Sequence, residues 1–383
     1  MHPKRPLPDA AVWGLTLILA AVAAKRIILQ SRELLAGTSY AAAFDLHLRY
    51  VETVRWITGA SIAEVKGMDY PPATYAVLGP LIGHLGWPAV RALWLMLSLA
   101  ALAVLSGIAA HAVECRLGTR CLAAVLPWAA YGSALTVGVG QLGLICLATG
   151  LWGILLARRV GRRPAGAALA GLLFALSLVK PTLTAPWFWL LGLASPAAAC
   201  LAVLLYAAAT LAACASRPEP LAQLLTAWID NGHGHVARGY GSVAGWANAL
   251  GLEGWIVPLG LAMLAGLGLW VYRHRDADLW VLLGVSAFVA RFFTYHYYVD
   301  DLLLLVPMIP LLRLATQDAG ISLRLRRAAS AVFLLTALSQ LTPTRWFTDL
   351  GPRIAHATEA SQIAVWLAAA GVLVWAAHRR LTS

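Results

Sequence analysis

Long apolar runs separated by short polar turns dominate the pattern of this chain. Most of the runs approach the length that an α-helix needs to cross a bilayer core, about 20 residues. We therefore expect about twelve membrane spans, several of them short or flanked by proline. The runs cover residues 10–30, 88–113, 120–137, 141–157, 164–180, 182–194, 196–215, 254–272, 279–294, 300–316, 327–343 and 361–377.

One further run, Ala73 to Gly86, is only about fourteen residues long, which is below the usual spanning length. We interpret it as a half-inserted or re-entrant helix. A full span there would break the alternation of the basic loops described below.

The stretch from Phe44 to Pro72 is too polar to lie within lipid. Its spacing predicts a helix that ends at Gly59 and carries Asp45, Arg49 and Glu52 on one side. We expect this helix to lie flat on the membrane with its apolar face down and with Asp45 and Arg49 upward. The alternative is a plain surface ion pair between Asp45 and Arg49, which are four residues apart. The apolar face consists of Phe44, Leu48, Val51, Val54 and Ile57.

The amino-acid composition indicates a membrane protein. Hydrophobic residues make up 60% of the 383 residues and charged residues only 12%, and there are 16 tryptophans. A soluble globule does not have this balance, so we expect residues 1–383 to form a single, all-α, polytopic integral membrane domain. The net charge of +12 does not indicate a nucleic-acid partner, because the basic residues cluster in short loops where they set topology.

The basic loops fall on one side if the spans alternate as given above, and that side is then cytoplasmic. The opposite side receives two longer segments, residues 31–87 with interfacial helices inside it and residues 216–253. The loops around Gln141, Lys180 and His296 lie on that side as well. The basic positions are Lys4 and Arg5, Arg116 to Arg120, Arg158, Arg159, Arg162 and Arg163, Arg273 to Arg275, Arg313 to Arg327, and Arg379 and Arg380.

Neither a disulfide nor a metal site is expected. The five cysteines lie mostly inside or at the ends of apolar runs and have no CxxC spacing, so we interpret them as packing residues. His233 and His235 resemble a metal motif, but no third ligand lies at a familiar spacing, and a mobile polar loop is favoured.

Charged residues at the ends of apolar runs are candidates for function because their burial is costly. Lys180 could simply extend to the interface, although a basic residue on the non-cytoplasmic side opposes the general trend. Arg291, about five residues inside its run, must be paired, hydrated or bound to an anion. His296 belongs to an aromatic cluster typical of an interfacial belt, yet it lies between Arg291 and Asp300. Gln141 is either a turn residue or a hydrogen-bonding partner for a sugar or phosphate.

One set of residues occurs in a fixed order along the chain: Phe44 and Asp45, Tyr50, Gly59, Tyr70 to Pro72, Gly140 and Gln141, Lys180 and Pro181, and His296 and Tyr297 before Pro307. This ordered set resembles glycosyltransferase family eighty-seven, the polyprenyl-phosphate-mannose-dependent α-mannosyltransferases of GT-C architecture. The resemblance covers about residues 44–310. Two departures, Gly143 and Gly241 at positions where the family often has Asn, affect the acceptor more than the reaction.

The resemblance implies roles for individual residues. Asp45 is expected to be the general base for the acceptor hydroxyl, and Tyr70 to shape the rim of the site. The cations Lys180, Arg291 and His296 are expected to surround the donor phosphate. The full substrate-binding set is Arg49, Tyr70, Gln141, Lys180, Arg291, His296 and Asp300.

These roles predict a membrane glycosyltransferase that transfers a hexose, mannose by the resemblance, from a polyprenyl-phosphate sugar to a hydroxyl of a glycolipid or lipid-linked glycan. One carboxylate base together with cations for the leaving phosphate suits direct displacement with inversion. No cofactor or metal is expected, the lipid-phosphate sugar being a co-substrate, and membrane lipids are the other partners. The implied location is the plasma (inner) membrane, with the site facing the periplasm or cell exterior.

Two other functions fit a polytopic basic chain. A lipid or glycolipid transporter or flippase would place polar groups near the bilayer midplane and would often show internal repeats, and no convincing repeat is present. A structural membrane subunit would leave Lys180, Arg291 and the polar Phe44–Pro72 stretch without a role.

The basic loops lead to a topology prediction. Both termini should be cytoplasmic, and the loops that hold Asp45, His235 and His296 should lie outside. Single-cysteine labelling of intact cells with a membrane-impermeant reagent should modify cysteines placed in these three loops. Labelling of the Asp45 loop only after permeabilisation would contradict the predicted site.

Overall fold

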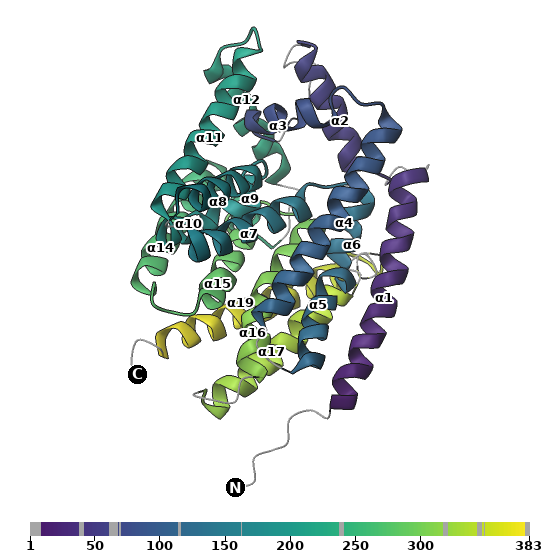
Figure 1. Ribbon diagram of the computed structural model, residues 1–383, viewed down its shortest axis with the longest axis vertical. Helices are drawn as coiled ribbons and strands as arrows, with labels where there is room; N and C mark the ends of the chain where they lie inside the picture. The colour runs from purple at the N-terminus through teal and green to yellow at the C-terminus, as the bar shows by residue number, and fades with distance from the viewer. Residues whose placement is uncertain are drawn as a thin grey trace.

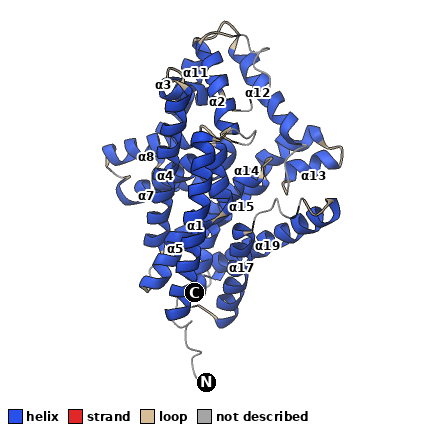
Figure 2. Ribbon diagram, turned by 90° about the vertical axis from the view of Figure 1, so that its right-hand side faces the viewer, coloured by secondary structure: helices blue, strands red, loops and turns tan. Residues whose placement is uncertain are grey.

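The computed structural model describes residues 9–37, 42–60, 68, 70–113, 116–161, 163–236, 241–316, 321–342, 347 and 349–379. Within these ranges every regular element is a helix and no strand occurs (Figures 1 and 2). The longer helices are α1 (Asp9–Ala36), α2 (Phe44–Ile57), α3 (Pro72–Ile82), α4 (Trp87–Ala112), α5 (Leu117–Ala129), α6 (Tyr131–Val139), α7 (Gly143–Val160), α8 (Pro164–Ser177), α11 (Pro196–Ala215), α12 (Leu221–Val236), α14 (Ile256–Arg273), α15 (Leu279–Phe292), α16 (Leu305–Thr316), α17 (Leu323–Leu341) and α19 (Pro352–Arg379).

Short helical pieces join the longer ones. They are α9 (Pro181–Thr184), η2 (Ala185–Trp187), α10 (Phe188–Ala194), α13 (Val243–Ala249), η3 (Glu253–Trp255) and η4 (Tyr298–Leu304).

The all-helical, membrane-spanning character predicted from the sequence is confirmed. In the described part of the chain, six helices are long and apolar enough to cross a membrane, or up to eight if each of two bent pairs counts as one span. The prediction of about twelve spans is not reached, although each apolar run lies on a helix. Several runs form helices that are too short on their own, such as α15 with 14 residues and α16 with 12. The run from Ala73 to Gly86, for which the sequence predicts a short half-inserted or re-entrant helix, contains most of α3, which has 11 residues.

A sharp bend follows α8. The pair α8 and α9–α10 turns by 118° at this point. Pro181 begins α9, and helical geometry is disfavoured for a residue before proline. Lys180 accordingly has φ −124° and ψ 77°. The chain therefore forms a helical hairpin with Lys180 at its apex. The hydroxyl of Ser195, after α10, donates to the carbonyl of Gly161, before α8, so the two arms return to the same place.

The bundle consists of two groups of helices. On one side α1, α4 and α5 pack together, and α7, α8 and α11 form the adjoining layer (Figure 1). On the other side α15, α16, α17 and α19 pack in sequence. The short helix η4 contacts α6, α7, α15 and α16 and so lies where the two groups meet. A single apolar core of buried residues runs through both groups.

The predicted loop segments are more ordered than expected. α1 continues to Ala36, so the segment predicted for residues 31–87 starts later than residue 31. The segment 216–253 contains α12 and α13, and the interpretation of His233 and His235 as part of a mobile loop is wrong for the backbone, which is helical there. The side chains of these two histidines lie outside the described residues.

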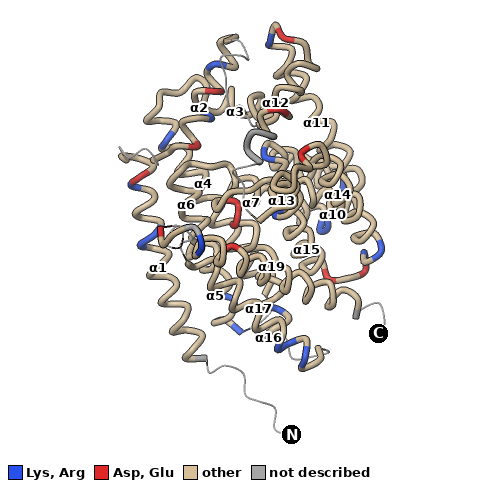
Figure 3. Tube along the Cα trace, turned by 180° about the vertical axis from the view of Figure 1, so that it is seen from behind, with Lys and Arg blue, Asp and Glu red and all other residues tan. Residues whose placement is uncertain are grey.

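Basic residues gather at one end of α16 and α17 (Figure 3). Arg313 is in the last turn of α16, and Arg324 and Arg326 are in the first turns of α17. This end belongs to the loop that the sequence predicts to be cytoplasmic. Lys4 and Arg5, as well as Arg162 and Arg380, lie outside the described residues.

Arg26 of α1 ties three helices together. Its guanidinium donates to the carbonyl of Ala129 and to that of Leu341, both at 2.6 Å. These are the last residues of α5 and α17, whose terminal carbonyls have no partner within their own helices. A cation at a helix C-terminus also interacts favourably with the helix dipole. Arg26 thus satisfies two helix ends at once.

We expect Arg26→Leu to destabilise the protein by about 1–3 kcal/mol, because two carbonyls would lose their donor. Thermal unfolding of the purified protein in detergent measures the change. Lys25→Leu, at the neighbouring exposed position, is the matched control and should have little effect. Equal stability of the Arg26→Leu variant and the control would contradict this role.

Candidate active site

A cavity of about 240 Å³ lies among the segments that the basic-loop pattern places on one side of the membrane. Helices α2, α12 and α14, the hairpin apex and the turn before η4 all contribute to its wall. Its charged lining residues in the described part of the chain are Asp45, Lys180 and Asp300. Among the described residues, the lining consists of Asp45, Tyr70, Pro71, Gln141, Lys180, Pro181, Thr182, Trp228, Ile229, Gly232, Ile256, Val257, Thr294, Tyr295, Tyr297 and Asp300.

Five of the eight predicted site residues therefore meet on one wall, namely Asp45, Tyr70, Gln141, Lys180 and Asp300. The other three, Arg49, Arg291 and His296, are not among the lining residues. They are buried behind the wall and hold its members in place.

Asp45 lies in the first turn of α2, where the helix dipole favours a negative charge. The start of this helix is fixed by Ala43, whose backbone N–H donates to the carbonyl of Gly138 at 3.0 Å. Ala43 adopts φ 52°, and it is the one non-glycine residue with a positive φ among those described. Gly140 allows the close approach of α6, because it has φ 73° and a β-carbon there would lie 2.5 Å from the Leu46 Cβ. The position of Asp45 is thus set by the end of α6.

Arg49 lies on a buried polar face of α2. Its guanidinium pairs with Glu52 at 2.8 Å and lies over the ring of Tyr70 at 4.5 Å. Glu52 also accepts a hydrogen bond from the Tyr75 hydroxyl at 2.9 Å, which docks α2 on α3. The Tyr70 ring that lines the cavity is thereby held from behind by a cation–π contact.

The predicted helix over Phe44–Ile57 is confirmed, but the predicted direction of Arg49 is wrong. Arg49 and Glu52 face the protein and are buried, whereas Phe44, Leu48 and Ile57 on the other face are 37–38% exposed. The two charges pair with each other, and their attraction offsets part of the desolvation cost of burying the polar face. The face left for lipid is the apolar one.

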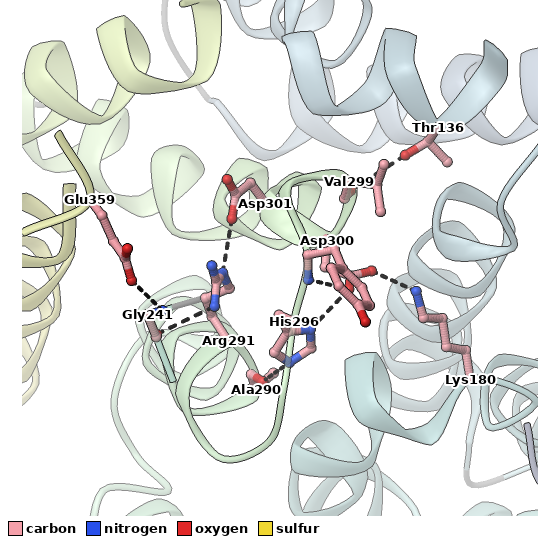
Figure 4. A network of polar contacts seen from close by, with 11 residues as sticks. Thr136, Lys180, Gly241, Ala290, Arg291, His296, Val299, Asp300, Asp301 and Glu359 are labelled. Carbon is pink, nitrogen blue, oxygen red and sulfur yellow. Dashed lines mark hydrogen bonds and ion pairs between the residues drawn. The ribbon is translucent and has the colours of Figure 1, made fainter. Parts of the chain in front are cut away.

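Lys180 projects from the hairpin apex and pairs with Asp300 at 2.5 Å (Figure 4). The apex is anchored by the Thr74 hydroxyl of α3, which donates to the carbonyl of Val179 at 2.7 Å. Lys180 is only 9% exposed. Its ammonium is therefore fixed at the cavity wall and does not extend to the interface.

Three groups approach the carboxylate of Asp300, and two of them donate hydrogen bonds to it. Besides Lys180, the backbone N–H of Tyr297 donates to its Oδ2 at 3.2 Å, and Nδ1 of His296 lies 3.3 Å from the same oxygen. His296 is fully buried, and its Nε2 lies 2.7 Å from the carbonyl oxygen of Ala290. His296 therefore reaches the cavity only through Asp300.

Arg291 is paired, as its depth in an apolar run requires. It lies in the last turn of α15 and donates to Asp301 at 2.9 Å and to the Gly241 carbonyl at 3.4 Å (Figure 4). It also stands over the Trp366 ring at 4.9 Å. Gly241 in turn donates its N–H to Glu359 at 3.0 Å. The network joins α15, η4 and α19, and it does not present Arg291 to the cavity.

Gln141 is both a turn residue and a lining residue. Its backbone N–H donates to the carbonyl of Thr136 at 3.0 Å, and the residue is 6% exposed. The side chain of Thr136 lies 3.4 Å from the carbonyl of Val299, which brings the Gln141 turn next to η4.

The apolar part of the wall was missed by the sequence analysis. It includes Trp228 and Ile229 of α12 and Ile256 and Val257 of α14. A signal existed: Leu221, Leu224 and Trp228 follow helical spacing, and Leu224 is buried. The tyrosines Tyr295 and Tyr297, expected in an interfacial belt, also line the cavity.

Metal ligands are not clustered in the described part of the chain, where no group of three or more His, Cys, Asp or Glu residues could hold an ion. The four cysteines within it, Cys121, Cys146, Cys200 and Cys214, are free thiols. The polar and aromatic groups that the cavity offers to a ligand are a lysine, two carboxylates, an amide and tyrosine and tryptophan rings.

Comparison with protein-family models, with curated protein sequences and with solved structures finds no match for this chain.

The Arg291–Asp301 pair provides a test of the network behind the cavity. Removing one partner of a buried ion pair costs about 3–5 kcal/mol, since the other charge is left uncompensated. Arg291→Met and Asp301→Asn should therefore each lower the midpoint of thermal unfolding strongly. The double variant should be less destabilised than the two single effects predict together. Strict additivity would show that the pair is not coupled.

Proposed function

We propose that this protein is a membrane glycosyltransferase that moves a hexose, mannose by the resemblance to family eighty-seven, from a polyprenyl-phosphate sugar to a hydroxyl of a glycolipid or lipid-linked glycan. The observation that supports this most directly is the meeting of Asp45 and Lys180 on the wall of one cavity. A sugar transfer from a phosphate ester needs a base for the incoming hydroxyl and a cation for the departing phosphate. These two residues supply one of each.

The proposed reaction is a single displacement. The acceptor oxygen bonds to the anomeric carbon and gives its proton to Asp45, while the bond from that carbon to the phosphate oxygen breaks and its electron pair stays on the phosphate. Lys180 stabilises the negative charge that develops there. No second carboxylate acts as nucleophile, so a β-linked donor gives an α-linked product.

Asp45 is preferred to Asp300 as the base because of their surroundings. Asp300 is engaged by Lys180 and by the Tyr297 N–H, with His296 at 3.3 Å. A carboxylate stabilised by several donors is a weak base. Tyr70, Gln141, Tyr295 and Tyr297 provide hydroxyl, amide and ring groups that suit a sugar.

The apolar part of the wall suits a lipid-linked substrate. Ile229 and Val257 line the cavity and are also 46% and 48% exposed at the surface. Because α14 is one of the candidate membrane spans, an apolar chain attached to the substrate can remain in lipid while its polar head is in the cavity.

A transporter or flippase remains the second candidate, and the bent hairpin of α8 and α9–α10 favours it, since broken helices are common in transporters. The two functions differ in their products. A transferase gives a new glycoside from donor and acceptor in detergent, whereas a transporter needs a sealed vesicle and leaves its substrate chemically unchanged.

The central prediction concerns Asp45→Asn. The amide is nearly isosteric, so the protein should fold and bind substrate, but the transfer rate should fall by about 10²- to 10⁴-fold. The measurement is transfer of radiolabelled sugar from a lipid-phosphate donor, with thermal unfolding measured in parallel.

Asp230→Asn is the matched control, because it makes the same chemical change at an exposed carboxylate of α12. It should retain the rate of the unaltered protein. A folded Asp45→Asn protein with near-normal transfer would exclude Asp45 as the base.

A further inference from the structure

The protonation of His296 is constrained on one side by a carbonyl group. Nε2 of its ring lies 2.7 Å from the carbonyl oxygen of Ala290. A carbonyl oxygen can only accept a hydrogen bond, so Nε2 must carry the hydrogen. In a neutral imidazole the other nitrogen, Nδ1, then has a lone pair and no proton.

That lone pair would face a carboxylate. Nδ1 lies 3.3 Å from Oδ2 of Asp300, and two acceptor atoms at this distance in a buried site repel each other. A proton on Nδ1 removes the conflict, because Asp300 is paired with Lys180 and stays ionised. The His296–Asp300 pair then holds one proton more than a neutral imidazole and a carboxylate do.

This proton changes the charge at the cavity wall. Asp300 is also paired with Lys180, so a single carboxylate faces two basic groups. With His296 neutral, Asp300 would cancel the charge of Lys180, and the group of three would attract no anion. With the extra proton the group carries one net positive charge.

We propose that the proton shared by His296 and Asp300 gives the Lys180–Asp300–His296 group its positive charge, and that anionic phosphate binds in the cavity only while this proton is present. The inference rests on the proposed function for the identity of the ligand, a phosphodiester. His296 is a positioning residue here, because it touches Asp300 and is not part of the cavity lining.

The direction of the pH dependence follows from the groups around His296. Burial lowers the pKa of His296 below its ordinary value, Asp300 raises it, and the charges of Arg291 and Lys180 lower it further. Arg291 is itself paired with Asp301. The proton is present at low pH and leaves as the pH rises through this pKa, so phosphate affinity falls with rising pH. A bound phosphate adds negative charge nearby and raises the pKa of His296, so binding takes up a proton.

The test measures binding to the full-length protein in nanodiscs between about pH 4 and about pH 8, because burial places the pKa of His296 below that of an ordinary histidine. The probe is polyprenyl methyl phosphate, a diester that keeps one negative charge over this range. Its affinity should fall on the order of tenfold across the range, as loss of one nearby charge implies. Polyprenol, the neutral lipid, should show no such change. Dimethyl phosphate should show the same trend at lower affinity, which separates the anion from its lipid anchor.

Two variants separate charge from structure. His296→Gln keeps an amide N–H for the Ala290 carbonyl but cannot become a cation. It should bind the diester on the order of tenfold more weakly at pH ~4 and show no pH dependence. Adding Asp300→Asn to His296→Gln removes the opposing negative charge and should restore binding at all pH values. Because this change leaves the buried Lys180 uncompensated, thermal unfolding is measured for both variants and binding is compared only for folded protein.

A purely structural role of His296 predicts the opposite, with the double variant no better than the single one. That outcome, or the same pH profile in the unaltered protein and in His296→Gln, would overturn the proton-linked charge. In those cases binding of the diester and transfer of sugar can still be observed, and the proposed function stands. If the unaltered protein does not bind the diester at any pH, both the inference and the proposed phosphate ligand are overturned.

Discussion

The buried ion pair between Lys180 and Asp300 connects the two halves of the bundle. Lys180 comes from the hairpin apex beside α7 and α11, and Asp300 comes from η4 between α15 and α16. Removing one partner of such a pair leaves an uncompensated buried charge, so each half depends on the other for its polar residue. The cavity forms where this pair reaches the surface of the core. The same contact therefore sets both the packing of the bundle and the charge of the site.

The two adjacent carboxylates of η4 have different partners, one at the cavity and one in the packing of the bundle. Asp300 and Asp301 are consecutive residues of a 3₁₀ helix, in which successive side chains point about 120° apart. Asp300 faces Lys180 and His296, while Asp301 faces Arg291 and the network that reaches Trp366 and Glu359. The second network holds η4 against α15 and α19, and so fixes the direction in which Asp300 points. Neither acid can move without disturbing the partner of the other.

The sequence allowed much of the site to be predicted, and the reason is physical. Alternation of basic loops placed Asp45, Gln141, Lys180 and Asp300 at the same side of the membrane, and the structure brings them to one cavity. The pattern could not show which cations reach the cavity. A charged residue in an apolar run must have a partner, but the partner of Arg291 is the neighbour of the expected acid, and this is decided by tertiary packing.

The faces of helix α2 were likewise predicted only in part. The spacing in Phe44–Ile57 correctly separated polar from apolar residues, but it could not tell which face meets the protein, because that depends on Tyr70 and Tyr75. The predicted number of spans is not confirmed, and the reason is related. Hydropathy counts every apolar run, whereas a run followed by proline, as at Lys180, can turn back and form one arm of a hairpin.

The environments of the two carboxylates in the cavity support different roles for them. Asp300 is surrounded by donors and a lysine, so its negative charge is stabilised and its tendency to take up a proton from substrate is low. Asp45 lies in the first turn of a helix whose other face is apolar and exposed, and it lines the same cavity. Pairs of acids in contrasting surroundings are a common basis for dividing base and electrostatic functions. In the proposed reaction, Asp300 would modulate the positive charge that faces the phosphate, and Asp45 would act on the acceptor.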